Sequence, residues 1–209
     1  MKLLVIGCSG LLGSKLVQQA SQKYEVYGTY NSRPVKFRNI VTVKADKTKE
    51  DEVIRIIKEV SPDWVIDTAA LHNVDYCEEN KELSWQVNVE GTLNVVKACN
   101  KIGAGLVFTS TDYVFDGNKG FYTESDKRNP LNYYGYCKMK AEDLIEENME
   151  EYLIVRPSVI YGWNPLALRG AKSSSGKTMN YVMWLIKLSL IHISEPTRPR
   201  LISYAVFCL

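Results

Sequence analysis

The sequence lacks an excess of charge of either sign. Its 209 residues include 26 lysines and arginines against 24 aspartates and glutamates, which leaves a formal net charge of +2 at pH 7. A protein that binds nucleic acid through phosphates carries a basic face, and this balance predicts none. We therefore expect a small-molecule ligand and no nucleic-acid partner.

Cysteine pairs with metal-ligand or redox spacing are also missing, and so are long apolar runs. The absence of CxxC pairs predicts reduced thiols in a cytoplasmic protein and no metal site. The five cysteines are Cys8, Cys77, Cys99, Cys137 and Cys208. No basic leader precedes the first apolar segment, so we expect no secretion signal. The apolar stretch 183–193 contains Lys187 and is too short for a bilayer core of about 30 Å, which predicts no membrane partner.

What the sequence does contain is a regular alternation of strand-like and helix-like segments. Short apolar runs typical of buried strands occupy 2–6, 25–30, 64–66, 105–108 and 152–155. Apolar residues at helical spacing occupy 11–17, 50–60, 83–102, 134–147 and 179–186. With right-handed crossovers, this alternation predicts an α/β fold with a doubly wound parallel sheet, which is Rossmann-like.

A glycine-rich turn joins the first predicted strand to the first predicted helix. It reads GCSGLLG, with glycines at Gly7, Gly10 and Gly13. The first glycine permits a tight turn, the second lets the backbone approach a pyrophosphate, and the third allows helix and sheet to pack closely. The helix N-terminus offers free N–H groups to the phosphates. In this position the turn predicts dinucleotide binding, and an ordinary tight turn is the alternative.

The end of the second predicted strand lacks the acidic residue that binds the ribose 2′-hydroxyl of NAD. Residues 29–33 read TYNSR instead. The guanidinium of Arg33 suits a 2′-phosphate, which favours NADPH over NADH as the cofactor. A solvated loop cation is the competing interpretation of Arg33.

Tyr134 and Lys138 are four residues apart and therefore project from one helix face. A phenol with a pKa near 10 is a poor acid or base at neutral pH, and a neighbouring ammonium favours its phenolate form. Tyr134 is then able to exchange a proton with the oxygen of a carbonyl–alcohol pair. In isolation such a spacing is more typical of a surface pair, and Tyr133 and Tyr136 are competing phenols.

Three hydroxyl residues, Thr109, Ser110 and Thr111, follow the fourth predicted strand. Ligands of open α/β sheets bind beyond the carboxyl ends of the strands. A hydroxyl in this position suits a hydrogen bond to a substrate carbonyl, which stabilises charge on its oxygen. Spacing does not choose among the three, and a strand-end turn capped by side chains is their alternative role.

Three segments, taken in order, resemble the dTDP-4-dehydrorhamnose reductase family of extended short-chain dehydrogenases. They are GCSGLLG at 7–13, STDYVFDG at 110–117 and YGYCK at 134–138, of which STDYVFDG is the most specific. Pro130-Leu131-Asn132, Ala69-Ala70, Val74-Asp75, Cys77-Glu78 and Val87-Asn88 agree as well. The resemblance covers roughly residues 1–186.

The resemblance implies that Thr111 is the catalytic hydroxyl, that Tyr134 donates the proton, and that Lys138 orients the tyrosine and the nicotinamide ribose. Beyond the glycine turn and Arg33, it implies cofactor contacts from Ser9, Gly10, Leu11, Leu12, Asp46, Ala69, Ala70 and Thr109. Asp112 is expected to face the substrate, and Asn88 to support the site or to serve as a packing amide. The implied reaction moves a hydride from NADPH, or NADH, to C4 of a 4-keto-6-deoxy sugar nucleotide. Its substrate would be dTDP-4-dehydro-L-rhamnose and its product dTDP-L-rhamnose.

The sequence departs from this family in two places. Many relatives carry tryptophan in an Arg-Thr-Ser-Trp-Val run, where this chain has Val159, which cannot stack on a sugar or base. From about Leu188 the chain matches nothing in the family and resembles a translated sequencing adapter. We therefore expect an NAD(P)-binding domain over 1–160, the start of an incomplete substrate lobe over 161–187, and a non-family tail over 188–209. Cofactor binding with little turnover is expected of this chain.

Two other functions share the fold and its motifs. The chain also resembles the regulatory beta subunit of methionine adenosyltransferase, which works through contact with a partner. Nucleotide-sugar epimerases and dehydratases hold NAD and use the same YxxxK pair. The intact Thr111, Tyr134 and Lys138 set and the STDYVFDG segment favour the reductase with a nucleotide-sugar substrate, and a homodimer is left open.

Cofactor preference provides the first test. Because Arg33 replaces an acid at the second strand, we expect a lower Michaelis constant for NADPH than for NADH. Steady-state kinetics with each cofactor measure the two constants. A clear preference for NADH would contradict the assignment of NADPH.

Overall fold

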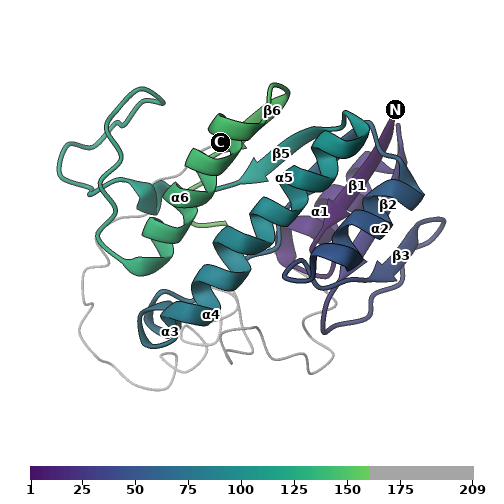
Figure 1. Ribbon diagram of the computed structural model, residues 1–209, viewed down its shortest axis with the longest axis horizontal. Helices are drawn as coiled ribbons and strands as arrows, with labels where there is room; N and C mark the ends of the chain where they lie inside the picture. Colours follow the sequence, from purple (N-terminus) through teal and green to yellow (C-terminus); the bar gives the residue numbers. More distant parts are fainter. Residues whose placement is uncertain (161–209) are drawn as a thin grey trace, which may run out of the picture.

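Each of the five apolar runs expected as strands forms one in the computed structural model, which describes residues 1–160 (Figure 1). A sixth strand lies at one edge of the same sheet. The strands are β1 (Lys2–Ile6), β2 (Glu25–Tyr30), β3 (Val41–Lys44), β4 (Trp64–Asp67), β5 (Gly105–Thr109) and β6 (Tyr152–Val155). All pairings are parallel, in the order β3-β2-β1-β4-β5-β6. The expected doubly wound, Rossmann-like sheet is therefore confirmed.

The strand order reverses direction between β1 and β4. Residues 3–6 of β1 pair with residues 64–67 of β4, so their carboxyl ends lie side by side. The chain leaves β1 into the glycine turn at Gly7 and leaves β4 into Thr68. In open α/β sheets, ligands bind outside the carboxyl ends at this switch point.

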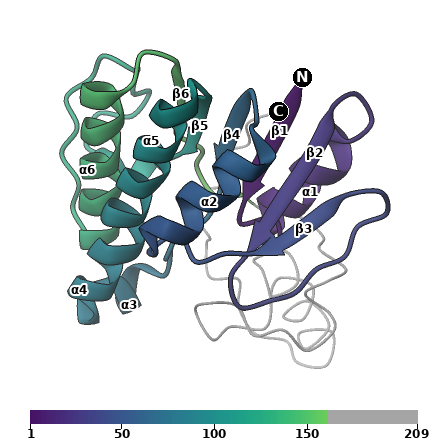
Figure 2. The same ribbon diagram turned by 45° about the vertical axis from the view of Figure 1, so that its right-hand side comes forward.

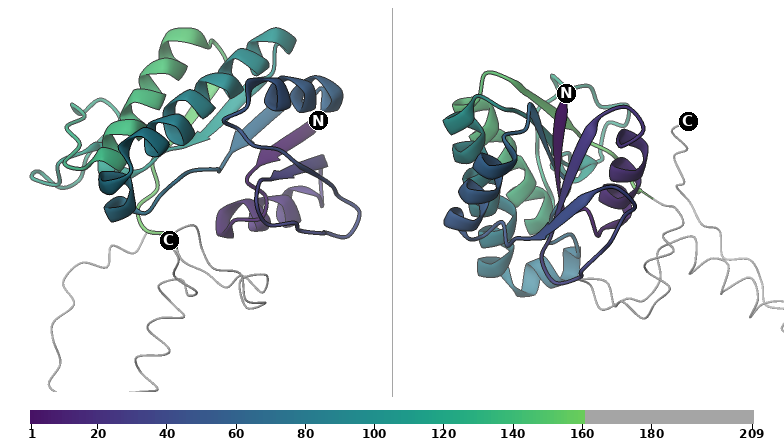
Figure 3. Two further views of the ribbon diagram at one scale, coloured as in Figure 1. Left: turned by 60° about the horizontal axis from the view of Figure 1, so that its bottom comes forward. Right: turned by 90° about the vertical axis from the view of Figure 1, so that its right-hand side faces the viewer.

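Helices cover both faces of the sheet. Their bounds are α1 (Leu11–Ala20), α2 (Glu50–Val60), α3 (Val74–Glu79), α4 (Lys81–Trp85), α5 (Gly91–Ile102) and α6 (Tyr133–Asn148). Figures 2 and 3 show α2, α5 and α6 side by side on one face and α1 on the other. The larger apolar core lies under the three helices, and a smaller one lies between the sheet and α1. Within residues 1–160, no helix combines the length and apolar content that a membrane span requires.

Three elements differ from the sequence-based expectation. The strand β3 was not predicted, because it is a four-residue edge strand whose residues are exposed or half-buried and so lacks an apolar run. The helix α3 was also missed. The expected helix 83–102 begins earlier, at Lys81, and is interrupted by a π-helical segment, η1 (Gln86–Glu90), before α5. The predicted helix 179–186, the lobe 161–187 and the tail 188–209 lie outside the described residues.

The third glycine of the turn provides a test of the close contact between α1 and β1. A Cβ atom at Gly13 would lie 2.4 Å from the carbonyl oxygen of Gly7, whereas one at Gly10 would lie 3.3 Å from the same atom. Alanine normally favours a helix over glycine by about 1 kcal/mol. We expect the reverse for Gly13→Ala, a loss of about 1–3 kcal/mol in the free energy of unfolding, because the clash is with backbone.

The matched control for this prediction is Gly10→Ala, which adds the same methyl group three residues earlier. Urea denaturation of both variants and the parent measures the difference. Equal stability of the two variants would contradict the close contact at Gly13.

Candidate active site

The turn after β1 leaves the N-terminus of α1 open. Gly7 has φ of +84°, a conformation that favours glycine, and its carbonyl accepts a 3.0 Å hydrogen bond from the N–H of Gly10. Gly10 is the N-cap of α1 and has no side chain to cap the helix, and the first turn holds no acidic residue. In contrast, α2 begins with Glu50, Asp51 and Glu52. The first turn of α1 is therefore suited to an anion.

Arg33 and Asp46 follow neighbouring strands at the same edge of the sheet. Arg33 lies half-buried in the bend after β2, and within residues 1–160 its guanidinium forms no ion pair. Asp46 follows β3, and its Oδ1 accepts hydrogen bonds from the N–H of Thr48 at 3.0 Å and the hydroxyl of Thr48 at 2.8 Å. Both residues thus lie beyond the carboxyl ends of their strands. The glycine turn follows β1 at this same end of the sheet.

The structure distinguishes the three hydroxyls that spacing left equivalent. The hydroxyl of Ser110 is buried and donates to the carboxylate of Glu142. Thr109 is the half-buried last residue of β5. Thr111 is buried at the start of a 3₁₀ turn, η2 (Asp112–Val114), and its hydroxyl is close enough to Tyr134 to oppose the rise in the pKa of the phenol. Thr111 is therefore the hydroxyl that lies against the tyrosine.

Tyr134 and Lys138 are buried together on α6, with exposed fractions of 8% and 2%. Tyr134 packs in a small apolar cluster with Leu71 and Cys77. The ammonium of Lys138 lies 3.7 Å from the centroid of the Phe108 ring on β5. Lys138 therefore faces the sheet, and Tyr134 packs beside the segment that follows β4.

A second pair on the same helix has the same spacing but a different environment. Lys140 lies four residues after Tyr136, and its Nζ is 5.9 Å from the centroid of the Tyr136 ring. Tyr136 is 38% exposed, and Lys140 forms a 2.9 Å ion pair with Asp143. Tyr136 and Lys140 thus form the surface pair that is usual for this spacing, and burial sets Tyr134 and Lys138 apart.

Burial shifts the pKa values of Tyr134 and Lys138 in the directions that favour their neutral forms. It raises the pKa of Tyr134 well above its ordinary value; the charge of Asp112 adds to this, and the hydrogen bond with Thr111 opposes it. Burial, and then the charge of Lys47, lowers the pKa of Lys138 to about 7. The pKa of the phenol is therefore raised, and not lowered as expected from the neighbouring ammonium, because desolvation dominates. Tyr134 carries its proton at neutral pH.

Burial also raises the pKa of Asp112, against opposing hydrogen bonds from the hydroxyl of Thr111 and nearby N–H groups. Asn88 lies buried in η1, where its side chain binds both the N–H and the carbonyl of Leu71, at 3.0 and 2.9 Å. Because Leu71 packs in the same cluster as Tyr134, Asn88 holds the backbone beside the tyrosine, an arrangement that suits both of its predicted roles. Sequence alone left open whether it supports the site or serves as a packing amide.

Glu142, which was not predicted from the sequence, connects the site to the rest of the fold. Glu142 is fully buried on α6, four residues after Lys138. Besides Ser110, it binds Arg128 at 2.8 Å and Arg156 at 2.8 and 3.0 Å. Burial opposes ionisation of Glu142, but these hydrogen bonds outweigh it and lower the carboxyl pKa. The continued four-residue spacing from Tyr134 through Lys138 was the available sequence signal.

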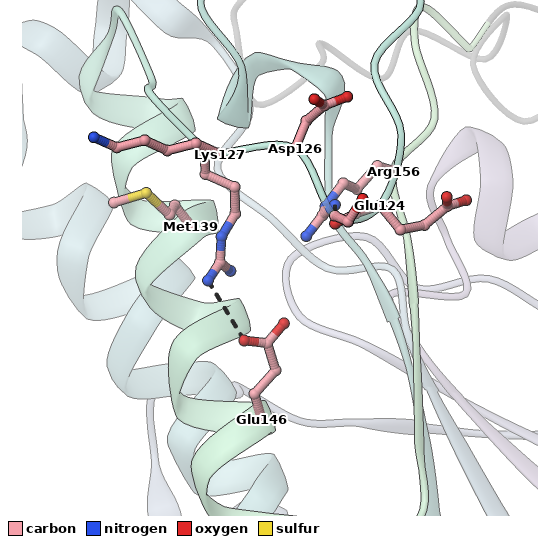
Figure 4. A pocket seen from close by; sticks show the side chains of 8 residues that line it. Glu124, Asp126, Lys127, Met139, Glu146 and Arg156 are labelled. Carbon is pink, nitrogen blue, oxygen red and sulfur yellow. Dashed lines mark hydrogen bonds and ion pairs between the residues drawn. The ribbon is translucent and has the colours of Figure 1, made fainter.

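Two surface hollows lie away from the predicted site residues. The first, of about 430 Å³, lies beside α6, where Arg156 and Glu146 face it (Figure 4). The second, of about 650 Å³, is lined mainly by residues 79–86 with Tyr133. Neither hollow includes a residue predicted to be catalytic or to bind the cofactor. Within the described part of the chain, no group of three or more His, Cys, Asp or Glu side chains is arranged to hold a metal ion.

The lowered pKa of Lys138 has a measurable consequence for stability. Its pKa is about 7 when folded and 10.5 ordinarily, so between these values the unfolded chain binds more protons and stability rises with pH. Relative to Lys138→Met, which cannot titrate, we expect the cofactor-free parent to gain on the order of 2 kcal/mol between pH 7.5 and pH 9.5. Urea unfolding at the two pH values measures this gain. The exposed Lys97→Met variant is the control, and equal pH dependence in Lys138→Met and the parent would contradict the prediction.

The chain is similar to several known proteins. The model of the RmlD substrate binding domain family matches residues 1–183. The chain is 35% identical over 164 residues to a probable low-salt glycan biosynthesis reductase of Haloferax volcanii, covering 78% of this chain and 54% of the relative. It is 34% identical over 164 residues to methionine adenosyltransferase 2 subunit beta of Bos taurus, covering 77% and 47%.

Among solved structures, the chain resembles the dTDP-4-dehydrorhamnose reductase of Bacillus anthracis in complex with NADP. The TM-score is 0.75 at 29% identity, and the match covers 91% of this chain and 60% of that one. The chain spans about half the length of the curated relatives it matches. Because the family model matches most of its residues, the chain belongs to the RmlD substrate binding domain family.

Proposed function

We propose that this protein reduces the C4 carbonyl of a 4-keto-6-deoxy sugar nucleotide with NADPH, converting dTDP-4-dehydro-L-rhamnose to dTDP-L-rhamnose. The observation that carries this proposal is the burial of Thr111, Tyr134 and Lys138 together at the carboxyl end of β5. This is the sheet edge onto which the glycine turn also opens. Residues 1–160 are assigned as the dinucleotide-binding domain.

The residues at the switch point fit a dinucleotide. The uncapped first turn of α1 suits the pyrophosphate, and Ser9, Leu11 and Leu12 lie in or beside that turn. We assign adenosine contacts to Arg33 and Asp46. We assign contacts near the nicotinamide to Ala69 and Ala70, which follow β4, and to Thr109, which ends β5. The related Bacillus anthracis reductase was solved with NADP, which supports NADPH as the cofactor, with NADH as the alternative. When bound, the reduced nicotinamide supplies the hydride that adds to C4 of the sugar.

The protein's own groups handle the carbonyl oxygen. Tyr134 is protonated at neutral pH and is positioned beside Thr111, so it donates the proton that the oxygen needs. The Thr111 hydroxyl donates a hydrogen bond to the same oxygen and stabilises its developing charge. Lys138 orients the phenol and the nicotinamide ribose, and Asp112 contacts the sugar. Each reduction thus adds one hydride to carbon and one proton to oxygen.

The regulatory subunit is a second candidate, and one observation favours it. Methionine adenosyltransferase 2 subunit beta is 34% identical over 77% of this chain. Such a subunit would bind a methionine adenosyltransferase catalytic chain, which gel filtration of the mixture detects. The buried Thr111, Tyr134 and Lys138 set favours an enzyme over this candidate. The STDYVFDG segment and the absence of an acid at the end of β2 favour the reductase over an epimerase or dehydratase.

Substitution of the tyrosine tests the proposed chemistry. In a chain as long as its relatives, Tyr134→Phe should lower kcat for dTDP-4-dehydro-L-rhamnose by about 10²–10⁴-fold, because the proton donor is lost. The dissociation constant for NADPH should stay within about twofold, since the ring is retained. NADPH oxidation with a panel of keto-sugar nucleotides measures the first quantity, and equilibrium fluorescence titration measures the second.

The matched control is Tyr136→Phe, which removes the same hydroxyl from the exposed Tyr136–Lys140 pair. This variant should retain the parent rate. Parent-like turnover in Tyr134→Phe would refute the mechanism, and a parent that reduces none of the panel but binds a methionine adenosyltransferase would favour the regulatory subunit.

A further inference from the structure

A buried ion pair lies beneath the proposed cofactor site and takes no part in the chemistry described above. Lys47 lies between β3 and α2, and Asp67 is the last residue of β4; their exposed fractions are 6% and 1%. The Nζ atom of Lys47 lies 2.6 Å from Oδ2 of Asp67. Neither residue belongs to the set predicted from sequence.

The pair holds both polar groups of one backbone residue. The N–H of Ala69 donates to Oδ1 of Asp67 at 3.0 Å, and the carbonyl of Ala69 accepts from Nζ of Lys47 at 2.9 Å. The third proton of the ammonium is directed to the hydroxyl of Thr92 at 3.3 Å. All three N–H donors of the Lys47 ammonium therefore have an acceptor, and both the N–H and the carbonyl of Ala69 are hydrogen-bonded to the ion pair.

Ala69 in turn forms the wall behind the glycine turn. A Cβ atom at Gly7 would lie 3.0 Å from the backbone nitrogen of Ala69 and 3.1 Å from its Cα. The two backbones are thus in direct contact at the switch point. A displacement of Ala69 therefore changes the shape of the turn and of the edge proposed to receive the nicotinamide.

The surroundings of Lys47 are shaped to its side chain. A Cβ atom at Gly91 would lie 2.9 Å from Cε and 3.0 Å from Cγ of Lys47, so the glycine leaves room for the stem. The side-chain amide of Asn94 donates to the carbonyl of Lys47 at 3.1 Å and fixes its backbone. Both the stem and the backbone of Lys47 are therefore in contact with α5.

Burial of two charges is costly, and apolar residues of similar volume often stabilise a fold equally well or better. The pair is therefore poorly explained by stability alone. We propose that the Lys47–Asp67 ion pair is a positioning device that holds the Ala69 backbone against the glycine turn and thereby sets the affinity for the dinucleotide. This inference rests on the proposed function, because it takes the dinucleotide as the ligand.

The test separates positioning from simple stabilisation by comparing two variants. Lys47→Met leaves the charge of Asp67 buried without its partner, so it should lower the Tm by about 10 °C and raise the Kd for NADPH. The double variant Lys47→Met/Asp67→Leu removes both charges and should recover the Tm to within a few degrees of the parent. Its Kd for NADPH should nevertheless stay about 10-fold higher than that of the parent, because Ala69 is no longer held.

The measurements are thermal unfolding without ligand and equilibrium titration with NADPH by fluorescence, so neither depends on turnover. Lys97→Met, which breaks the exposed Lys97–Glu50 ion pair, is the control and should leave both values unchanged. A double variant with parent-like Tm and parent-like Kd overturns the inference while leaving the proposed function intact. A parent that binds neither NADPH nor NADH contradicts the proposed function itself, and the inference with it.

Discussion

The geometry of the site depends on one buried carboxylate, that of Glu142. It is fully buried, and its oxygens accept hydrogen bonds from Ser110, Arg128 and Arg156. A buried charge that lost these partners would cost several kcal/mol, so the four side chains hold one another in place. Through them, the end of β5, the middle of α6 and the chain after β6 are joined at a single point. Because Thr111 directly follows Ser110, this point also sets the position of the proposed catalytic hydroxyl relative to α6.

Local sequence also places the N-terminus of α6 against the end of β5. The side chain of Asn132 caps the helix by accepting from the N–H of Gly135 at 2.8 Å. A Cβ atom at Gly135 would lie 2.2 Å from the carbonyl oxygen of Tyr113, so glycine allows the helix to contact the turn after β5. Tyr134 immediately precedes this contact. The phenol is therefore fixed by backbone packing on one side and by the Glu142 network two turns further along the helix.

The sequence predicts those features that are written in local patterns. The glycine turn and five of the six strands follow from apolar runs and from residues that the turn requires, whereas β3 has neither signal. The YxxxK spacing is satisfied twice, by Tyr134–Lys138 and by Tyr136–Lys140, and only tertiary burial separates the two pairs. The Lys47–Asp67 pair joins residues 20 positions apart in different parts of the fold, so no local sequence pattern predicts it. Long-range charge pairing is therefore the part of this site that required the structure.

These two charge systems also explain the state of Lys138. The charges of Lys47, Asp67 and Glu142 all act on it, but Lys47 is paired with Asp67 and Glu142 is already bound by two arginines. Each negative charge is thus largely compensated by its own partner, and the ammonium of Lys138 faces the ring of Phe108. Burial then dominates and lowers its pKa to about 7. A ligand that offers hydrogen-bond acceptors to Nζ favours the charged form again, and the ribose of the proposed dinucleotide is such a ligand.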